Sequence, residues 1–99
     1  MARFTLTQDA QENMCEIKGY SIREFGQGVA KEYLSAMRTT FQRLADNPET
    51  GHDETASFWP DVFSFPCVIH TVYYILNPGG ITVIGVIHQS RLPGLLPSR

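Results

Sequence analysis

This 99-residue sequence has few cysteines and no long apolar run. Cys15 and Cys67 are too few for a disulfide scaffold and lie in no CxxC pattern, so we expect two buried thiols. The longest apolar stretch, residues 72–76, is far shorter than the roughly 20 residues that span a bilayer, and no signal-peptide segment follows Met1. These absences exclude a transmembrane class and predict a cytoplasmic protein.

The sequence also lacks a basic excess. Eight lysines and arginines against ten acids give a net charge of -2 and a pI near 5.8, which argues against binding by phosphate neutralisation. We therefore expect no sequence-specific nucleic-acid binding. No acid follows Asp61, and Arg91 and Arg99 are the only fixed positive charges after it. The negative charge thus belongs to the first two thirds of the chain.

What is present indicates one domain over residues 1–99, since 42% of the chain is hydrophobic and 18% is charged. Phe4 and Leu6 alternate with polar neighbours, which predicts a short strand, and Thr7 is a suitable helix N-cap. A helix is expected from Gln8 onward, because small or apolar residues recur there at spacings of three and four: Ala10, Met14, Ile17 and Ser21.

A second helix is expected from Val29. Gly26 and Gly28 precede it as helix stop and restart, and Asn47–Pro48 ends it because proline cannot continue the hydrogen-bond ladder. Its apolar stripe is the clearest in the chain: Ala30, Tyr33, Leu34, Met37, Phe41, Leu44 and Ala45. Two helices joined by about three residues should lie antiparallel.

The second half of the chain favours strands. Val62–Cys67 reads as an edge or bulged strand because it contains a proline. Val68–Leu76 and Ile81–His88 are rich in β-branched and aromatic residues, and Asn77–Gly80 between them supplies a turn, so we predict a β-hairpin. The chain is therefore predicted to be α+β, with a short N-terminal strand and an antiparallel helical hairpin packed on one face of a small antiparallel β-sheet.

Both faces of the predicted β-hairpin are apolar. On strict alternation, Val83 and Ile87 share one face, and Ile84 and Val86 share the other. Two helices can cover only one face of a sheet. The second face is therefore either covered by the chain's own loops or presented to another chain.

The ordered series of residues resembles a known family. Its first part is Asn13-Met14, Ile17, Tyr20 and Phe25-Gly26. The stripe of the second helix follows at the family's spacing, with Pro48 and Gly51 after it. The last part is His70 with Val72-Tyr73-Tyr74, and then Val83–His88. This pattern is similar to the ParE branch of the RelE/ParE superfamily of bacterial type II toxins. The chain departs from it at His52 and Gly85, where arginines are common, and each departure removes a charge.

The sequence shows no Gly-rich phosphate loop and no metal-ligand spacing, so we predict no cofactor or metal. The resemblance implies a toxin that binds and blocks DNA gyrase and is held inactive by a cognate antitoxin. Two alternatives stay open. One is a ribosome-dependent messenger RNA endonuclease of the RelE kind, whose acid–base groups would be His70, His88 and Arg91. The other is a non-toxic homologue that only binds an antitoxin. His70, inside an apolar strand, is interpreted as structural, whereas His88 ends its strand beside polar residues.

Two contact surfaces follow from these patterns. The two-faced hairpin suggests that an antitoxin covers Val72, Tyr74, Val83 and Ile87, with a strand added at a sheet edge. The segment after the last strand is acid-free and rich in proline, which presents its leucines and arginine for target recognition. The predicted target-binding residues are His88, Gln89, Ser90, Arg91, Leu95 and Leu96.

Overall fold

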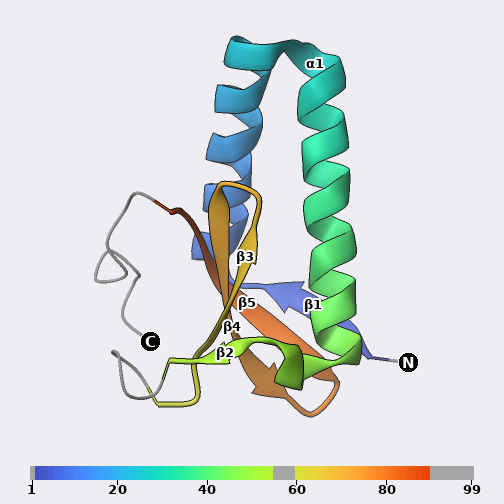
Figure 1. Ribbon diagram of the computed structural model, residues 1–99, viewed down its shortest axis with the longest axis vertical. Helices are drawn as coiled ribbons and strands as arrows, with labels where there is room; N and C mark the ends of the chain where they lie inside the picture. The colour runs from blue at the N-terminus through green and yellow to red at the C-terminus, as the bar shows by residue number, and fades with distance from the viewer. Residues whose placement is uncertain (1, 55–59, 90–99) are drawn as a thin grey trace.

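A long helical element packs against one face of a five-stranded sheet in the computed structural model, which describes residues 2–54 and 60–89 (Figure 1). The sheet order is β1-β5-β4-β3-β2, which confirms the α+β class. In chain order the elements are β1 (Arg3–Leu6), α1 (Gln8–Asp46), the 3-10 turn η1 (Pro48–Thr50), β2 (His52–Asp53), β3 (Phe63–Cys67), β4 (His70–Asn77) and β5 (Gly80–His88).

The helix begins and ends at the predicted residues. Thr7 caps it, since its side chain accepts a hydrogen bond from the Ala10 N–H at 3.2 Å, and Asn47 ends it. The expectation of two separate helices is wrong, however, because α1 is one helical element interrupted by a single residue, Gly26, with φ 87° and ψ 165°. We call residues 8–25 the first limb and residues 27–46 the second limb. One left-handed glycine folds the limbs back on each other without a connecting loop (Figure 1).

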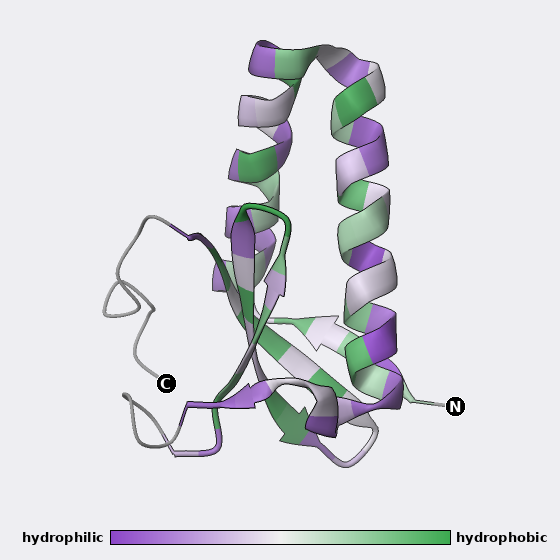
Figure 2. Cartoon of the chain, viewed as in Figure 1, coloured by the Kyte–Doolittle hydropathy of each residue, from purple (hydrophilic) through white to green (hydrophobic). Residues whose placement is uncertain are grey.

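Most residues of the predicted apolar stripes are buried, and Met14, Tyr33 and Leu34 are partly buried. Figure 2 shows hydrophobic residues along the inner sides of the limbs and polar residues outside. Phe41 and Met37 are fully buried, and the Phe41 ring meets that of Phe4 of β1 at a centroid distance of 5.4 Å. Burying each such side chain stabilises the fold by roughly 1.5 to 3 kcal/mol. The core below α1 is completed from the sheet by Cys67, Val72, Tyr74, Ile81, Val83 and Val86.

The sheet is mixed, so the prediction of an antiparallel sheet is wrong. β3, β4 and β5 pair antiparallel in chain order, but β1 pairs parallel to β5. The Arg3 N–H donates to the Gly79 carbonyl and the Thr7 N–H to the Val83 carbonyl. β5 thus pairs with β4 along one edge and with β1 along the other. β1 runs in the same direction as β5, and the chain then leaves β1 for α1.

A β-bulge corrects the predicted faces of β5. Tyr73 pairs with Gly85 but Tyr74 pairs with Val83, so Ile84 is an extra residue on β5. The bulge shifts the alternation by one position. Val86 consequently shares the α1 face with Val83, whereas Ile84 and Ile87 share the opposite face.

Val68 and Ile69 were expected inside a strand, but they form the two-residue turn between β3 and β4. The pairing of Cys67 with His70 closes this turn. Pro66 of β3 pairs with Thr71 on one side and lies beyond the short β2 on the other. The predicted edge position of the proline is therefore confirmed locally, because no partner strand needs its missing N–H.

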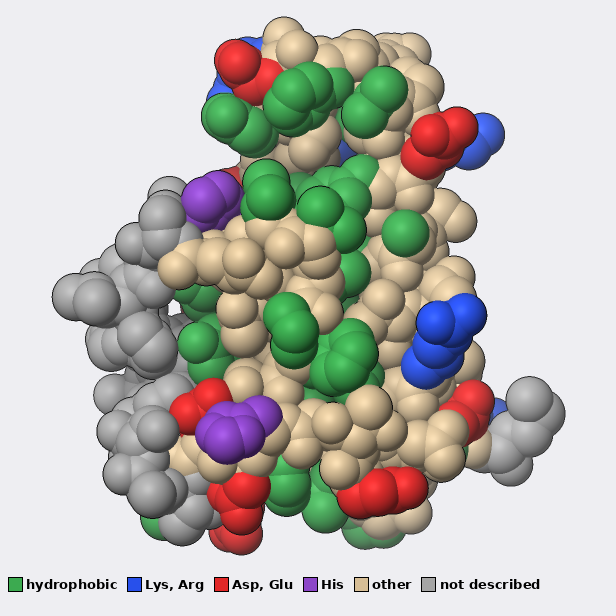
Figure 3. Space-filling model, in the orientation of Figure 1, with side chains coloured by type: hydrophobic (Ala, Val, Ile, Leu, Met, Phe, Trp, Pro, Cys, Tyr) green, Lys and Arg blue, Asp and Glu red, His purple; other side chains and the backbone are tan. Residues whose placement is uncertain are grey.

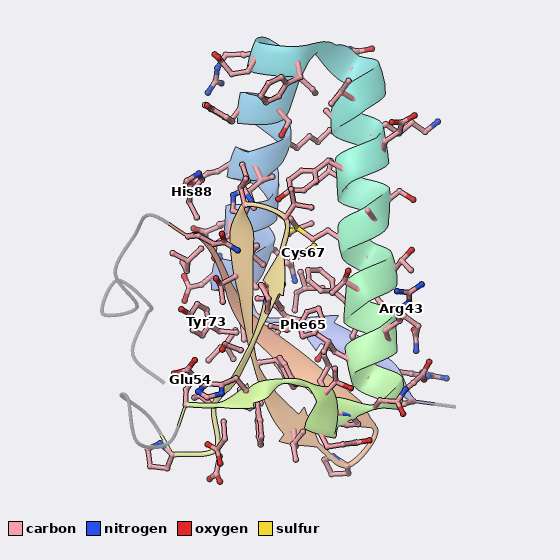
Figure 4. All side chains as sticks on the ribbon, viewed as in Figure 1. Arg43, Glu54, Phe65, Cys67, Tyr73 and His88 are labelled. Carbon is pink, nitrogen blue, oxygen red and sulfur yellow. The ribbon has the colours of Figure 1, made fainter. Side chains whose placement is uncertain are left out.

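The second face of the sheet is buried as well. Tyr73, Ile84 and Ile87 form a second cluster with Val62, which comes from the segment before β3. Figure 4 shows Tyr73 on this side of the sheet and Phe65 and Cys67 on the side of α1. The second face was expected to be covered either by the chain's own loops or by another chain. At these residues the chain itself covers it.

The two cysteines lie in different environments. Cys67 is buried, and its sulfur lies 3.7 Å from the Thr40 hydroxyl. Cys15 is exposed on the first limb, so the prediction of a buried thiol is wrong for it. The reason is its position next to Met14 in the helix, which turns it out of the stripe that faces the sheet.

The reversal at Gly26 makes a prediction about two glycines. An added Cβ would meet no atom within 4 Å at either Gly26 or Gly28, but only Gly26 has a left-handed φ. Gly26→Ala should lower the free energy of unfolding by about 1 to 3 kcal/mol, because the backbone angles at this residue lie in a region that essentially only glycine occupies. Gly28→Ala, the matched control inside the helix, should raise it by up to about 1 kcal/mol. Urea unfolding of both variants measures this, and equal effects would contradict the role of Gly26.

Candidate functional site

Two histidines meet at the end of the central strands. His70 of β4 pairs with His88 of β5 in register, and their rings approach edge to face at a centroid distance of 5.4 Å. His70 is buried and His88 is exposed, which matches the structural and surface positions expected for them. The Gln89 side chain donates to the His70 carbonyl at 3.3 Å and so joins the two strand ends.

Tyr33 of the second limb contacts this pair and was expected only as a core residue. Its hydroxyl lies 2.6 Å from His70 Nδ1 and donates to the Cys67 carbonyl at 3.3 Å. Burial, and to a lesser extent the charge of Cys67, raise the pKa of Tyr33 to about 12, although a hydrogen bond with the Ile69 backbone lowers it in part. The hydroxyl therefore stays protonated at neutral pH. A buried tyrosine that needs a partner for its hydroxyl was the signal in the sequence.

The histidines line a cleft of about 300 Å³ between the first limb and β5. Asn13 fixes the limb there, because its side-chain oxygen accepts a hydrogen bond from the Val86 N–H at 3.1 Å. We call this the histidine cleft, and it is lined chiefly by Asn13, Glu16, Tyr20, His70 and His88. Neither lysine nor arginine is among the described residues that line it.

An apolar hollow adjoins the histidine cleft and shares Tyr20 and His70 with it. It has a volume of about 280 Å³ and lies between the bend of α1 and the β3–β4 turn. Sequence periodicity did not identify it, because its exposed residues come from positions that were assigned to helix ends or to a strand. The large exposed side chains that line it are Tyr20, Phe25, Val29, Val68 and Ile69.

A third depression, which we call the outer groove, lies between the two limbs. It has a volume of about 470 Å³. Its apolar lining includes Ile22 and Leu34, and its charged residues are all cations: Lys18, Lys31 and Arg38. Arg38 also lines a neighbouring hollow of about 300 Å³ that reaches Phe4 and Leu6 of β1. The outer groove therefore continues toward the sheet edge.

All four residues expected to bind an antitoxin are buried in the core. Val72, Tyr74 and Val83 are fully buried beneath α1, and Tyr74 also donates to the Pro48 carbonyl at 2.7 Å. Ile87 is buried on the opposite face. Apolar alternation identified these positions correctly as packed, but it does not distinguish packing within the chain from packing against a partner.

The residues expected to bind a target divide into two groups. His88 and Gln89 are exposed at the end of β5. The remaining four lie outside the described residues: Ser90, Arg91, Leu95 and Leu96.

No metal-binding constellation or membrane span emerges from the described part of the chain. Within residues 2–54 and 60–89, no three histidine, cysteine or acidic side chains converge as metal ligands. None of the helical segments in these ranges combines the length and hydropathy needed to cross a bilayer. The described lining of the histidine cleft supplies imidazole, phenol, amide, carboxylate and apolar groups.

Comparison with known proteins agrees with this fold. A solved structure described as the chromosomal ParDE toxin–antitoxin system from P. aeruginosa matches with a TM-score of 0.74 at 12% identity, over 89% of this chain and 96% of that one. At such low identity the match shows a shared fold. A search of curated proteins finds no match. The family model of the ParE toxin of the type II toxin–antitoxin system parDE matches residues 4–93. Since that match spans most of the sequence, the chain belongs to the ParE toxin family.

Proposed function

We propose that this ParE-family chain is a cytoplasmic toxin that arrests growth by binding and inhibiting DNA gyrase, and that a cognate antitoxin neutralises it. Family membership supports the toxin and the existence of an antitoxin partner. The choice of a binding inhibitor over an enzyme depends on the chemistry of the histidine cleft.

The observation that carries this choice is the charge of the histidine cleft. Cleavage of RNA through a 2′-hydroxyl needs a base near neutral pKa and a cation that stabilises charge on the phosphate. The cleft has imidazoles, but Glu16 is its one fixed charge among the described lining residues. A carboxylate repels a phosphate, so the cleft favours a protein ligand over an RNA backbone.

The ribosome-dependent endonuclease remains the second candidate, because Tyr33, His70 and His88 are in contact. A tyrosine whose pKa lies near 12 cannot act as a base at neutral pH. Acid–base work would therefore fall to the histidines, with Arg91 as the cation. A non-toxic homologue that only binds an antitoxin is the third candidate, and it is distinguished by the absence of growth arrest.

The outer groove and the free edge of β1 support a specific site for the antitoxin. The lining of the outer groove includes Lys18, Lys31 and Arg38 around an apolar floor and no acid among the described residues, which suits an acidic amphipathic segment.

The edge of β1 offers backbone groups to the same segment. The odd-numbered residues of β1 form the backbone hydrogen bonds with β5, so the N–H and carbonyl groups of Phe4 face the open edge. Side chains of Gln42 and Gln11 donate to the carbonyls on either side of it: Ala2 at 2.9 Å and Leu6 at 3.2 Å. An extended antitoxin segment can add to this edge between the two glutamines.

The first of two predictions from this proposal concerns the target. Purified protein should inhibit supercoiling by gyrase, or stabilise its cleaved DNA complex, and should leave ribosome-bound messenger RNA intact. The reason is the missing cation in the described part of the histidine cleft. Supercoiling and messenger RNA cleavage are assayed side by side. Cleavage in the ribosomal A site that is lost in His88→Ala or Arg91→Ala would establish the endonuclease instead.

The second prediction concerns the antitoxin. Lys31→Glu should weaken antitoxin binding at least tenfold, because it places an acid beside an acidic segment, and the loss should shrink at high salt. The control is Arg23→Glu, which reverses an exposed cation of the same helix outside the outer groove. Titration calorimetry at two salt concentrations measures both variants. Equal losses for Lys31 and Arg23 would place the antitoxin elsewhere.

A further inference from the structure

The β3–β4 turn combines backbone strain with exposed apolar side chains. Val68 has φ 57°, a left-handed conformation that is unfavourable for a β-branched residue, and 72% of its surface is exposed. Ile69, beside it, is 43% exposed. Two-residue hairpin turns with positive φ at their first residue normally use glycine there. Val68 therefore adds backbone strain and buries little apolar surface, so it does not stabilise the fold.

The surrounding contacts hold this turn in place. The Tyr33 hydroxyl bridges its two ends, the Cys67 carbonyl and His70 Nδ1. From the other side, the Gln89 N–H donates to the Ile69 carbonyl at 2.8 Å. Strained residues persist where neighbours over-determine the conformation, and such positions cluster at binding sites. The turn is therefore a preorganised projection, which lowers the entropy lost when a partner binds.

The strained turn lies at the rim of the apolar hollow. Phe25 and Val29 at the bend of α1 are 60% and 52% exposed, and Tyr20 borders the hollow from the first limb. Figure 3 shows hydrophobic side chains gathered at the bend of α1 and over the β3–β4 turn. These residues come from three separate segments, and contiguous apolar surface of this kind marks interaction sites.

The charges around the apolar hollow indicate what kind of partner it takes. Glu16 and Glu24 lie four residues on either side of Tyr20, on one line of the first limb. The hollow and the adjoining histidine cleft have no lysine or arginine among their described lining residues. The outer groove has the opposite charge. A partner with apolar side chains flanked by lysine or arginine fits the hollow, whereas an acidic segment fits the outer groove.

We propose that the Val68–Ile69 turn and the apolar hollow are the docking surface for the toxin's target, separate from the surface that the antitoxin binds. The occupant is a segment of the target that presents an apolar side chain beside a basic one. This inference rests on the proposed function in that the chain acts by binding a target protein.

The test compares Val68→Gly and Val68→Asn with wild type in the full chain. Glycine removes both the side chain and the strain, and asparagine tolerates the left-handed conformation but is polar. Val68→Gly should raise the melting temperature by about 4 °C. Both variants should lose growth arrest, weaken binding to purified DNA gyrase at least tenfold, and leave antitoxin affinity within twofold. Leu76→Ala, which truncates another large exposed apolar side chain, on β4 outside the hollow, should change none of these.

Each result decides the proposal. Loss of arrest with higher stability and intact antitoxin binding supports it, because a merely structural residue would lower stability. Unchanged arrest in both variants overturns it. Weakened antitoxin binding with unchanged arrest also overturns it, and assigns the turn to the antitoxin. Growth arrest without gyrase inhibition overturns the gyrase target alone, since the docking surface is still judged by arrest. A wild-type chain that causes no arrest overturns both.

Discussion

The left-handed backbone of Gly26 is the constraint on which the rest of the structure depends. It folds α1 back within one residue, so that the apolar stripes of both limbs face the same side of the sheet. That geometry places Tyr33 over the ends of β3 and β4 and brings Phe25 near the β3–β4 turn. It also leaves the outer groove between the limbs. The bend at Gly26 therefore links the packing of the core to the apolar hollow and the outer groove.

The two sides of the folded helix differ in charge and in preorganisation. The outer groove has Lys18, Lys31 and Arg38 around an apolar floor, and its hollow continues to the edge strand β1. On the opposite side, Glu16 lies near the exposed Tyr20. The β3–β4 turn, with the strained backbone of Val68, is fixed there by the hydrogen bond from Tyr33 to the Cys67 carbonyl. Because charge steers a partner to the face that complements it, these sides suit different partners. The chain thus offers one surface for each of the two partners that we propose.

Side-chain periodicity was sufficient to predict elements whose apolar residues repeat at regular spacing. It was insufficient where the structure depends on pairing between residues far apart in the sequence. The α1 stripe and the β4–β5 hairpin were predicted because each depends on local spacing and on the turn at residues 77–80. Parallel pairing of β1 with β5 joins residues nearly eighty positions apart, and no local pattern encodes it. The exposed turn at Val68 was missed because β-branched residues favour strands. The exposed position of His88 at the end of its strand was predicted, whereas the contact of Tyr33 with His70 arises only from the tertiary fold.

Hydroxyl-radical footprinting of the chain, bound in turn to the antitoxin and to gyrase, tests most directly whether two partners use two surfaces. It reports the solvent exposure of individual side chains. The account predicts that the antitoxin protects Ile22 and Leu34 of the outer groove and leaves Phe25 and Val68 reactive, whereas gyrase does the reverse. Protection of the same residues by both partners would contradict it.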